Sequence, residues 1–362
     1  MRCTTLQDSR NVWVAFAACV FLFVGIYRFP VPPGQLRVAM QFLFEIATAL
    51  GLAAFLFIRI SRWIGAFLVL VVISHFYPWY GPASYLALNG IFYPLVWLTL
   101  VVVMAKEEST KALLDMMGVL ALAHFGYQCV QYAGLDMLYA QTSSENVVGF
   151  MANPNEASSL LAFCLPVFLR KRWRWGLPLM ALGLIMTKTS SGALSAAVGI
   201  LAYLALIGKL KYALAVASVG PLYIAFVDAP GIERWPVWKT AFLFWTDRPF
   251  FGIGLGNWKI LSGYFPWPAH WDMVHNQFLQ GLVEMGVCFG IICLGYFGSV
   301  ILRVWRLGDL SETLKLTLTA LMIVCVNAFV NYTISIQILA GLAVTWLAIL
   351  EICLRGDRRY AG

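Results

Sequence analysis

Charged residues are scarce in this chain. Asp, Glu, Lys and Arg make up 12% of its 362 residues, hydrophobic residues make up 61%, and mean hydropathy is +0.79. So few charges cannot cover a water-soluble surface, which excludes a soluble enzyme or binding domain. A spanning helix needs roughly 20 apolar residues, so the chain has room for about twelve spans. The sequence therefore predicts an all-α, polytopic transmembrane bundle that forms a single domain over residues 1–362.

Two further patterns are missing. The eight cysteines form no C-x-x-C pair and mostly lie within apolar runs, which argues against a disulfide framework or a zinc site. The formal charge of +8 does not indicate nucleic-acid binding, because the basic residues cluster beside hydrophobic spans, where they orient a membrane protein. No internal repeat of the kind found in many secondary transporters is visible.

Apolar runs separated by polar breaks predict the spans. The first run follows a polar stretch with two arginines, but no small-residue cleavage site comes after it, so we expect it to be a retained first helix. The predicted spans are 12–27, 38–58, 63–79, 85–104, 112–133, 157–169, 176–187, 192–208, 212–227, 278–302, 313–330 and 333–354.

Charge asymmetry orients these spans. Of the 25 Lys and Arg residues, seven fall on one side: Arg28, Arg37, Lys188, Arg234, Lys239, Arg248 and Lys259. The other 18 share the side of both termini, which should therefore be cytoplasmic. Spans 157–169 and 176–187 are short and either tilt, re-enter the membrane or extend into flanking polar sequence.

Ionisable residues at membrane depth would indicate a transport or proton pathway. Glu45 and His124 are the main candidates in this chain. Glu45 fits a proton or cation site and equally a buried carboxyl bonded to a neighbouring helix, whereas for His124 a packed histidine is favoured.

The outer connection 228–276 is far longer than usual, which is often a sign of function. Its tryptophans alternate with charges and fit the headgroup level of a membrane or the stacking faces for sugar rings. The glycine-rich run 251–258 lacks the lysine and the strand context of a nucleotide loop, so its glycines instead indicate a tight turn or a close backbone approach. At the end of this connection lies His275, and an imidazole of ordinary pKa can accept a proton from a hydroxyl at neutral pH. Asn276 is placed to cap the next helix, and Glu284 follows about two turns later.

Several motifs, in order and spacing, resemble those of the O-antigen ligase and O-antigen polymerase superfamily. They are the runs 149–155 (Gly-Phe-Met-Ala-Asn-Pro-Asn), 233–238, 247–258, 275–280 and 284–286. The resemblance covers roughly residues 145–300, and the number of spans agrees. It implies a bacterial inner-membrane glycosyltransferase with a GT-C-like bundle, a periplasmic active site in the long loop, and no metal or other cofactor. The donor would be an undecaprenyl-diphosphate-linked glycan, and the acceptor a lipid A core sugar or another glycan.

The resemblance also implies roles for single residues. His275 would be the base that activates the acceptor hydroxyl, and Arg234 would clamp the diphosphate through its planar guanidinium. Arg248 and Lys259 are weaker candidates for the same charge, and Asn276 belongs to the histidine motif. Glu284 either orients His275 or stabilises the first turns of its own helix.

One position departs from the family pattern. Many ligases carry Ser-Arg-Gly after the seventh span, and here Ser191 stands where the arginine is expected. Lys188 lies one helical turn away and could supply a point charge, but not a planar fork. Asn153 and Asn155, from the family-like Asn-Pro-Asn, are candidate substrate contacts and also fit an ordinary helix start.

The sequence thus predicts an inverting, metal-independent glycan transferase of the ligase type. A polymerase of the same superfamily is an alternative, as is a transporter or flippase for a lipid-linked sugar, which would need charge at membrane depth such as Glu45. An inactive scaffold, favoured by Ser191, is a third. The predicted partners are the glycan donor, the acceptor and the lipid bilayer, without nucleic acid.

Overall fold

A computed structural model describes residues 66–67, 70, 107–135, 147–151, 153–209, 211–212, 234–264, 271–332 and 336–356. Within these ranges every regular element is a helix, which confirms the predicted helical class. The helices are α5 (Glu107–Tyr132), α6 (Pro154–Phe168), the short 3-10 helix η1 (Arg174–Gly176), α7 (Leu177–Met186), α8 (Ser190–Leu206), α10 (Trp235–Asp247), α11 (Asn257–Ser262), α12 (Gln277–Trp305), α13 (Glu312–Val330) and α14 (Gln337–Gly356).

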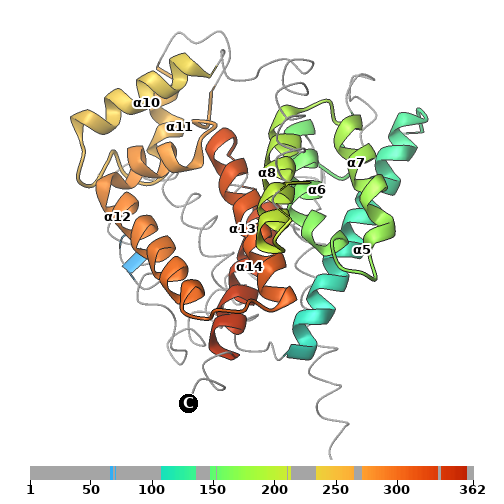
Figure 1. The fold of residues 1–362 in the computed structure, drawn as a ribbon. Coiled ribbons are helices and arrows are strands. Elements are labelled where there is room, and N and C mark those ends of the chain that lie inside the picture. Colours follow the sequence, from blue (N-terminus) through green and yellow to red (C-terminus); the bar gives the residue numbers. More distant parts are fainter. Residues whose placement is uncertain are drawn as a thin grey trace, which may run out of the picture.

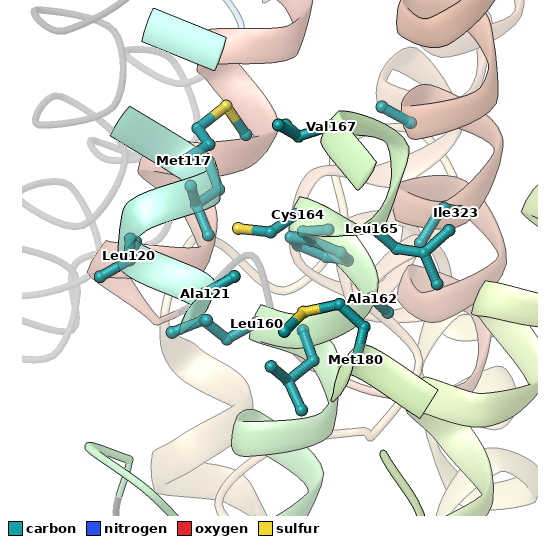
Figure 2. Packing of buried hydrophobic residues seen from close by; sticks show 14 of the residues in the cluster. Met117, Leu120, Ala121, Leu160, Ala162, Cys164, Leu165, Val167, Met180 and Ile323 are labelled. Carbon is teal, nitrogen blue, oxygen red and sulfur yellow. The ribbon is translucent and has the colours of Figure 1, made fainter. Parts of the chain in front are cut away.

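Helix α6 is the centre of the bundle. It begins at Pro154, a residue suited to a first helical turn, and the Asn153 side chain caps it by accepting a hydrogen bond from the Asn155 amide at 2.8 Å. All its residues from Ala157 onward are buried, and it contacts α5, α7, α8, α13 and α14. Figure 2 shows its side chains, such as Leu160 and Cys164, packed between Met117 of α5 and Ile323 of α13. A helix that is apolar all round belongs in such an interior position.

The basic connection after α6 is fastened to the start of α5. Asp115 accepts hydrogen bonds from Arg170 at 2.8 Å, from Arg172 at 3.1 Å and from the indole nitrogen of Trp173 at 2.8 Å. These contacts join the residues that we expect on the cytoplasmic side into one cluster at one end of the bundle.

Within the described residues, three helices are long and apolar enough to cross a membrane: Thr110–Tyr132, Gln277–Trp305 and Glu312–Val330. On α12, large apolar side chains such as Ile291 and Leu294 are exposed, as expected for a helix that faces lipid. The chain is therefore a membrane protein whose helices associate with a lipid bilayer.

Seven of the predicted spans coincide with helices: α5, α6, α7, α8, α12, α13 and α14. Two of these, α6 and α7, are the short ones, with 15 and 10 residues. The predicted spans 12–27, 38–58 and 85–104 lie outside the described residues, as does Glu45, while 63–79 and 212–227 meet them at only a few positions.

An ion pair fixes α12 to α14. The guanidinium of Arg303 donates two hydrogen bonds to the Glu351 carboxylate, at 3.0 and 3.1 Å, and the Tyr296 hydroxyl lies 3.5 Å from the same carboxylate. Glu351 is almost fully buried. At the opposite end of α12, α10 and α11 pack together above its first turns (Figure 1). The outer connection is thus not an irregular loop, because it contains these two helices.

Candidate functional site

The glycine-rich run of the outer connection is built into the backbone of α12. In a continuous helix the amide of Val287 would donate to the carbonyl of Val283. Here Val287 donates instead to Pro249 at 2.7 Å, and the Val283 carbonyl accepts from Ile253 at 2.8 Å. These two bonds take the place of the helical bond between the Val287 amide and the Val283 carbonyl. The break in α12 therefore leaves neither the amide nor the carbonyl unpaired.

Two glycines permit this insertion. Gly286 has φ 70° and ψ −167°, which breaks the helix, and Gly252 has φ 68°. A Cβ on Gly252 would overlap the Val283 carbonyl oxygen, and one on Gly286 would overlap the Phe250 carbonyl oxygen. Both positions therefore need glycine for conformation and for space. The predicted turn and close backbone approach are confirmed.

Glu284 holds the same run through its carboxylate. The backbone amides of Gly256 and Trp258 donate hydrogen bonds to it, and the Gln280 side-chain amide lies 3.5 Å from it. The other end of the Gln280 amide accepts from the backbone amide of Val274 at 3.3 Å. Glu284 therefore reaches the residue before His275 through Gln280, which makes it a positioning residue rather than a direct partner of the imidazole.

His275 adopts a left-handed backbone conformation, with φ 56°. Such a conformation is unfavourable for a residue with a side chain and is maintained only by firm neighbours. Val274 supplies one anchor, because its carbonyl accepts from the Trp238 indole at 2.9 Å. Asn276 supplies the other, because its side chain caps α12 by accepting from the Leu279 amide at 2.9 Å.

The imidazole of His275 lies between two aromatic rings. Its centroid is 4.8 Å from that of Trp271 and 4.6 Å from that of Tyr332, both edge to face. Its Nδ1 atom is buried and has no hydrogen-bond partner among the described residues. The ring is thus oriented by packing against Trp271 and Tyr332.

Burial, and to a smaller extent the positive charge of Arg234, together lower the pKa of His275 to about 4. The imidazole is therefore neutral at pH 7 and able to accept a proton.

Arg234 immediately precedes α10 and is 7% exposed. Its Nη1 donates to the carbonyl of Val330, at the last residue of α13. This bond fixes the guanidinium, which has five N–H donors, at the end of α13. Arg234 and His275 are the two predicted site residues that the structure places within electrostatic reach of each other.

A second polar cluster lies inside the bundle. The Ser191 hydroxyl donates to Asn155 Oδ1 at 3.1 Å, at the position where the family pattern has arginine. One turn deeper, Asn327 of α13 bonds to Ser159 at 3.1 Å and to Ser195 at 3.2 Å. Asn153 and Asn155 thus both have structural partners, and Ser191 is buried rather than open to solvent.

The C-terminal end of α13 connects the two clusters. Asn327 belongs to the buried polar cluster, whereas Val330 contacts Arg234 and Tyr332 contacts His275. The intervening Asn331 is 1% exposed, and its Nδ2 atom has no hydrogen-bond partner in the described part of the chain. No sequence motif marks this segment as part of the site, because 96 residues separate Arg234 from Val330.

The remaining predicted cations lie at the surface. Lys259 forms an ion pair with Asp272 at 3.4 Å, with both side chains more than half exposed. Arg248 ends α10 and is exposed, and Lys188 is exposed with φ 52°. None of these three cations forms a described contact with Ser191, where the family pattern has arginine.

His124 is a packed histidine. It is fully buried, and its Nδ1 accepts from the Phe150 amide at 3.2 Å. Across the described residues, no group of three or more His, Cys, Asp or Glu side chains is arranged to hold a metal ion.

Comparisons with protein-family models and with curated proteins find no match to this chain.

Proposed function

We propose that this membrane protein is a glycan transferase resembling the O-antigen ligases. In this proposal it moves a glycan from undecaprenyl diphosphate to a lipopolysaccharide core sugar or another sugar acceptor, at the periplasmic face of a bacterial inner membrane. The observation that carries the proposal is the imidazole of His275, packed between Trp271 and Tyr332, with the buried guanidinium of Arg234 close enough to lower its pKa.

The chemistry of transfer needs a base and a cation. An acceptor hydroxyl attacks the anomeric carbon of the donor, the bond from that carbon to the diphosphate oxygen breaks, and its electron pair leaves with the diphosphate. The hydroxyl proton passes to the imidazole of His275. The guanidinium of Arg234 stabilises the negative charge on the departing diphosphate. Attack from the side opposite the diphosphate inverts the anomeric configuration.

Two of the other predicted residues, Asn276 and Glu284, fit supporting roles in this scheme. Asn276 and Glu284 hold the backbone around His275 from either side, the first as a helix cap and the second through Gln280. Displacement of the histidine by even a small distance would slow transfer, because catalysis depends on the reacting groups being held in place.

The test is complementation of a deletion strain, with gel analysis of surface glycan. We expect His275→Ala to abolish transfer at unchanged membrane levels of the protein. Thr246→Ala, at an exposed position of α10 whose hydroxyl bonds only within its helix, should retain transfer. Normal glycan banding with His275→Ala would overturn the proposal.

The same gel separates the ligase from the polymerase. If the protein is a ligase, its deletion leaves a lipopolysaccharide core without capped chains. If it is a polymerase, the deletion leaves a single repeat unit on the core. Arg234→Lys should be nearly as harmful as loss of the charge, because an ammonium group cannot reproduce the planar fork.

A further inference from the structure

Outside the spanning helices, the end of the bundle that carries His275 has an exposed apolar face. It consists of three residues of α10, Trp235 (64% exposed), Phe242 (50%) and Leu243 (54%), and of Phe250 (68%) and Phe251 (46%) directly after it. We refer to these five residues as the outer apolar face. So many large apolar side chains together on a surface mark an interaction site.

The three residues on α10 share one side of the helix. At about 100° per residue, Trp235 and Phe242 are almost in line and Leu243 is within roughly 100° of both. The opposite side is buried by Val237 and Ala241, which pack in the cluster around Trp258. Helix α10 is therefore amphipathic, with one side packed on the protein and the other at least half exposed.

Tryptophan content alone would not locate this face. Trp238 and Trp258 use their indole nitrogens to bind backbone carbonyls inside the site, at Val274 and Trp271. Trp258 is completely buried. The exposed face is instead formed mainly by phenylalanine and leucine, which have no polar group to offer to a sugar or to water.

The face continues into the lipid-facing surface of α12. The bond between the Val287 amide and the Pro249 carbonyl places Phe250 beside the break at Gly286. Beyond this break, residues 287–305 form a helix of about 28 Å at ~1.5 Å per residue, close to the roughly 30 Å of a hydrocarbon core. Its Ile291 and Leu294 are also exposed.

The charges around the face fit lipid headgroups. Lys239 lies between Trp235 and Phe242 on the same side of α10, and Arg248 follows the helix; both are exposed. Flexible basic side chains beside apolar ones are typical of helices that lie in a membrane interface, where the cations reach phosphate groups.

We infer that α10 lies in the membrane interface, with the outer apolar face against lipid acyl chains and Lys239 and Arg248 at the phosphate groups. Because Arg234 immediately precedes this helix, the contact also fixes the depth of its guanidinium at the level of the phosphates. This last consequence rests on the proposed function, since that is the level at which the diphosphate of a lipid-linked donor would lie.

Photocrosslinking of the full-length protein tests the inference. p-Benzoylphenylalanine is placed at Phe242 or Phe250, and the protein is irradiated in nanodiscs of phosphatidylethanolamine and phosphatidylglycerol. Phe244 is the matched control, because it is on the same helix but packs edge to face on Trp258, with ring centroids 6.2 Å apart. Adducts are identified by mass spectrometry, and melting curves confirm that each variant is folded.

We expect lipid adducts at positions 242 and 250, several-fold more abundant than at 244, where crosslinks should form within the protein. Equal lipid labelling at 242 and 244, or none at 242 and 250, would overturn the inference. A crosslink from 242 or 250 to another protein in intact cells, in place of lipid, would overturn it too. No glycan donor is needed, so a negative result here leaves the test of His275 unaffected.

Discussion

Removal of the Glu284 carboxylate should release the glycine-rich run from α12. In Glu284→Ala, the backbone amides of Gly256 and Trp258 lose their acceptor within a buried site. Each buried donor left without a partner costs about 1–3 kcal/mol, so the free energy of unfolding should fall by about 2–6 kcal/mol. The Gln280 contact, at 3.5 Å, is long and adds little. Glu284→Gln keeps one acceptor oxygen and should lose about half as much.

Thermal unfolding in detergent, followed by tryptophan fluorescence, measures this loss. At about 2.1 cal/mol/K per residue, 1 kcal/mol corresponds to roughly 1.3 °C for a chain of 362 residues, so Glu284→Ala should melt at least about 2–3 °C lower. Trypsin should also cut faster after the exposed Lys259. Asp272→Asn is the control, because its ion pair with Lys259 is exposed and should contribute little. A Glu284→Ala protein with wild-type melting and wild-type proteolysis would refute the reasoning.

Three further predictions concern protonation, backbone space and the α12–α14 ion pair. Because the pKa of His275 is lowered to about 4, its neutral form should persist well below the ordinary titration range of histidine. The rate of its carbethoxylation, followed by mass spectrometry, should therefore fall to half near pH 4. Replacement of Arg234 by Met should move this midpoint to higher pH, and a wild-type midpoint near the ordinary pKa of histidine would contradict the electrostatic account. Gly286→Ala should lower the melting temperature and abolish transfer, because the new Cβ would overlap the Phe250 carbonyl and the backbone at this position has a positive φ. A wild-type melting temperature would contradict the close backbone approach at Gly286. Arg303→Leu and Glu351→Leu should each destabilise more than the double variant, because each single change leaves a half-buried or buried charge without its partner, and additive losses in a double-mutant cycle would show that the pair is not coupled.

The helices could be predicted from the sequence because their signals are local. Apolar runs located seven of them, and Asn276 was placed correctly as the cap of α12. The predicted ends of α13 and α14 differ from the observed ones by only a few residues. Such agreement is expected where a membrane imposes long uninterrupted apolar segments.

The interior of the candidate site could not be predicted in the same way. The bond between Ser159 and Asn327 joins residues 168 positions apart, and the break at Gly286 looks like any other glycine in an apolar run. Serine at position 191 suggested a missing cation, whereas its hydroxyl is used to bind Asn155. These features depend on which helices are neighbours, and no local pattern in the sequence carries that information.

The interruption of α12 has a mechanical consequence. Its outer turns accept backbone bonds from the glycine-rich run at Val283 and Glu284, and its inner segment is attached at Val287 to Pro249, which precedes that run. Beyond that attachment, Ile291 and Leu294 of the inner segment are exposed. A change in bilayer thickness tilts a spanning helix, and the tilt of the inner segment can be taken up by rotation about Gly286. The spacing between imidazole and guanidinium should then stay constant in membranes of different thickness, while the angle between the two parts of α12 changes.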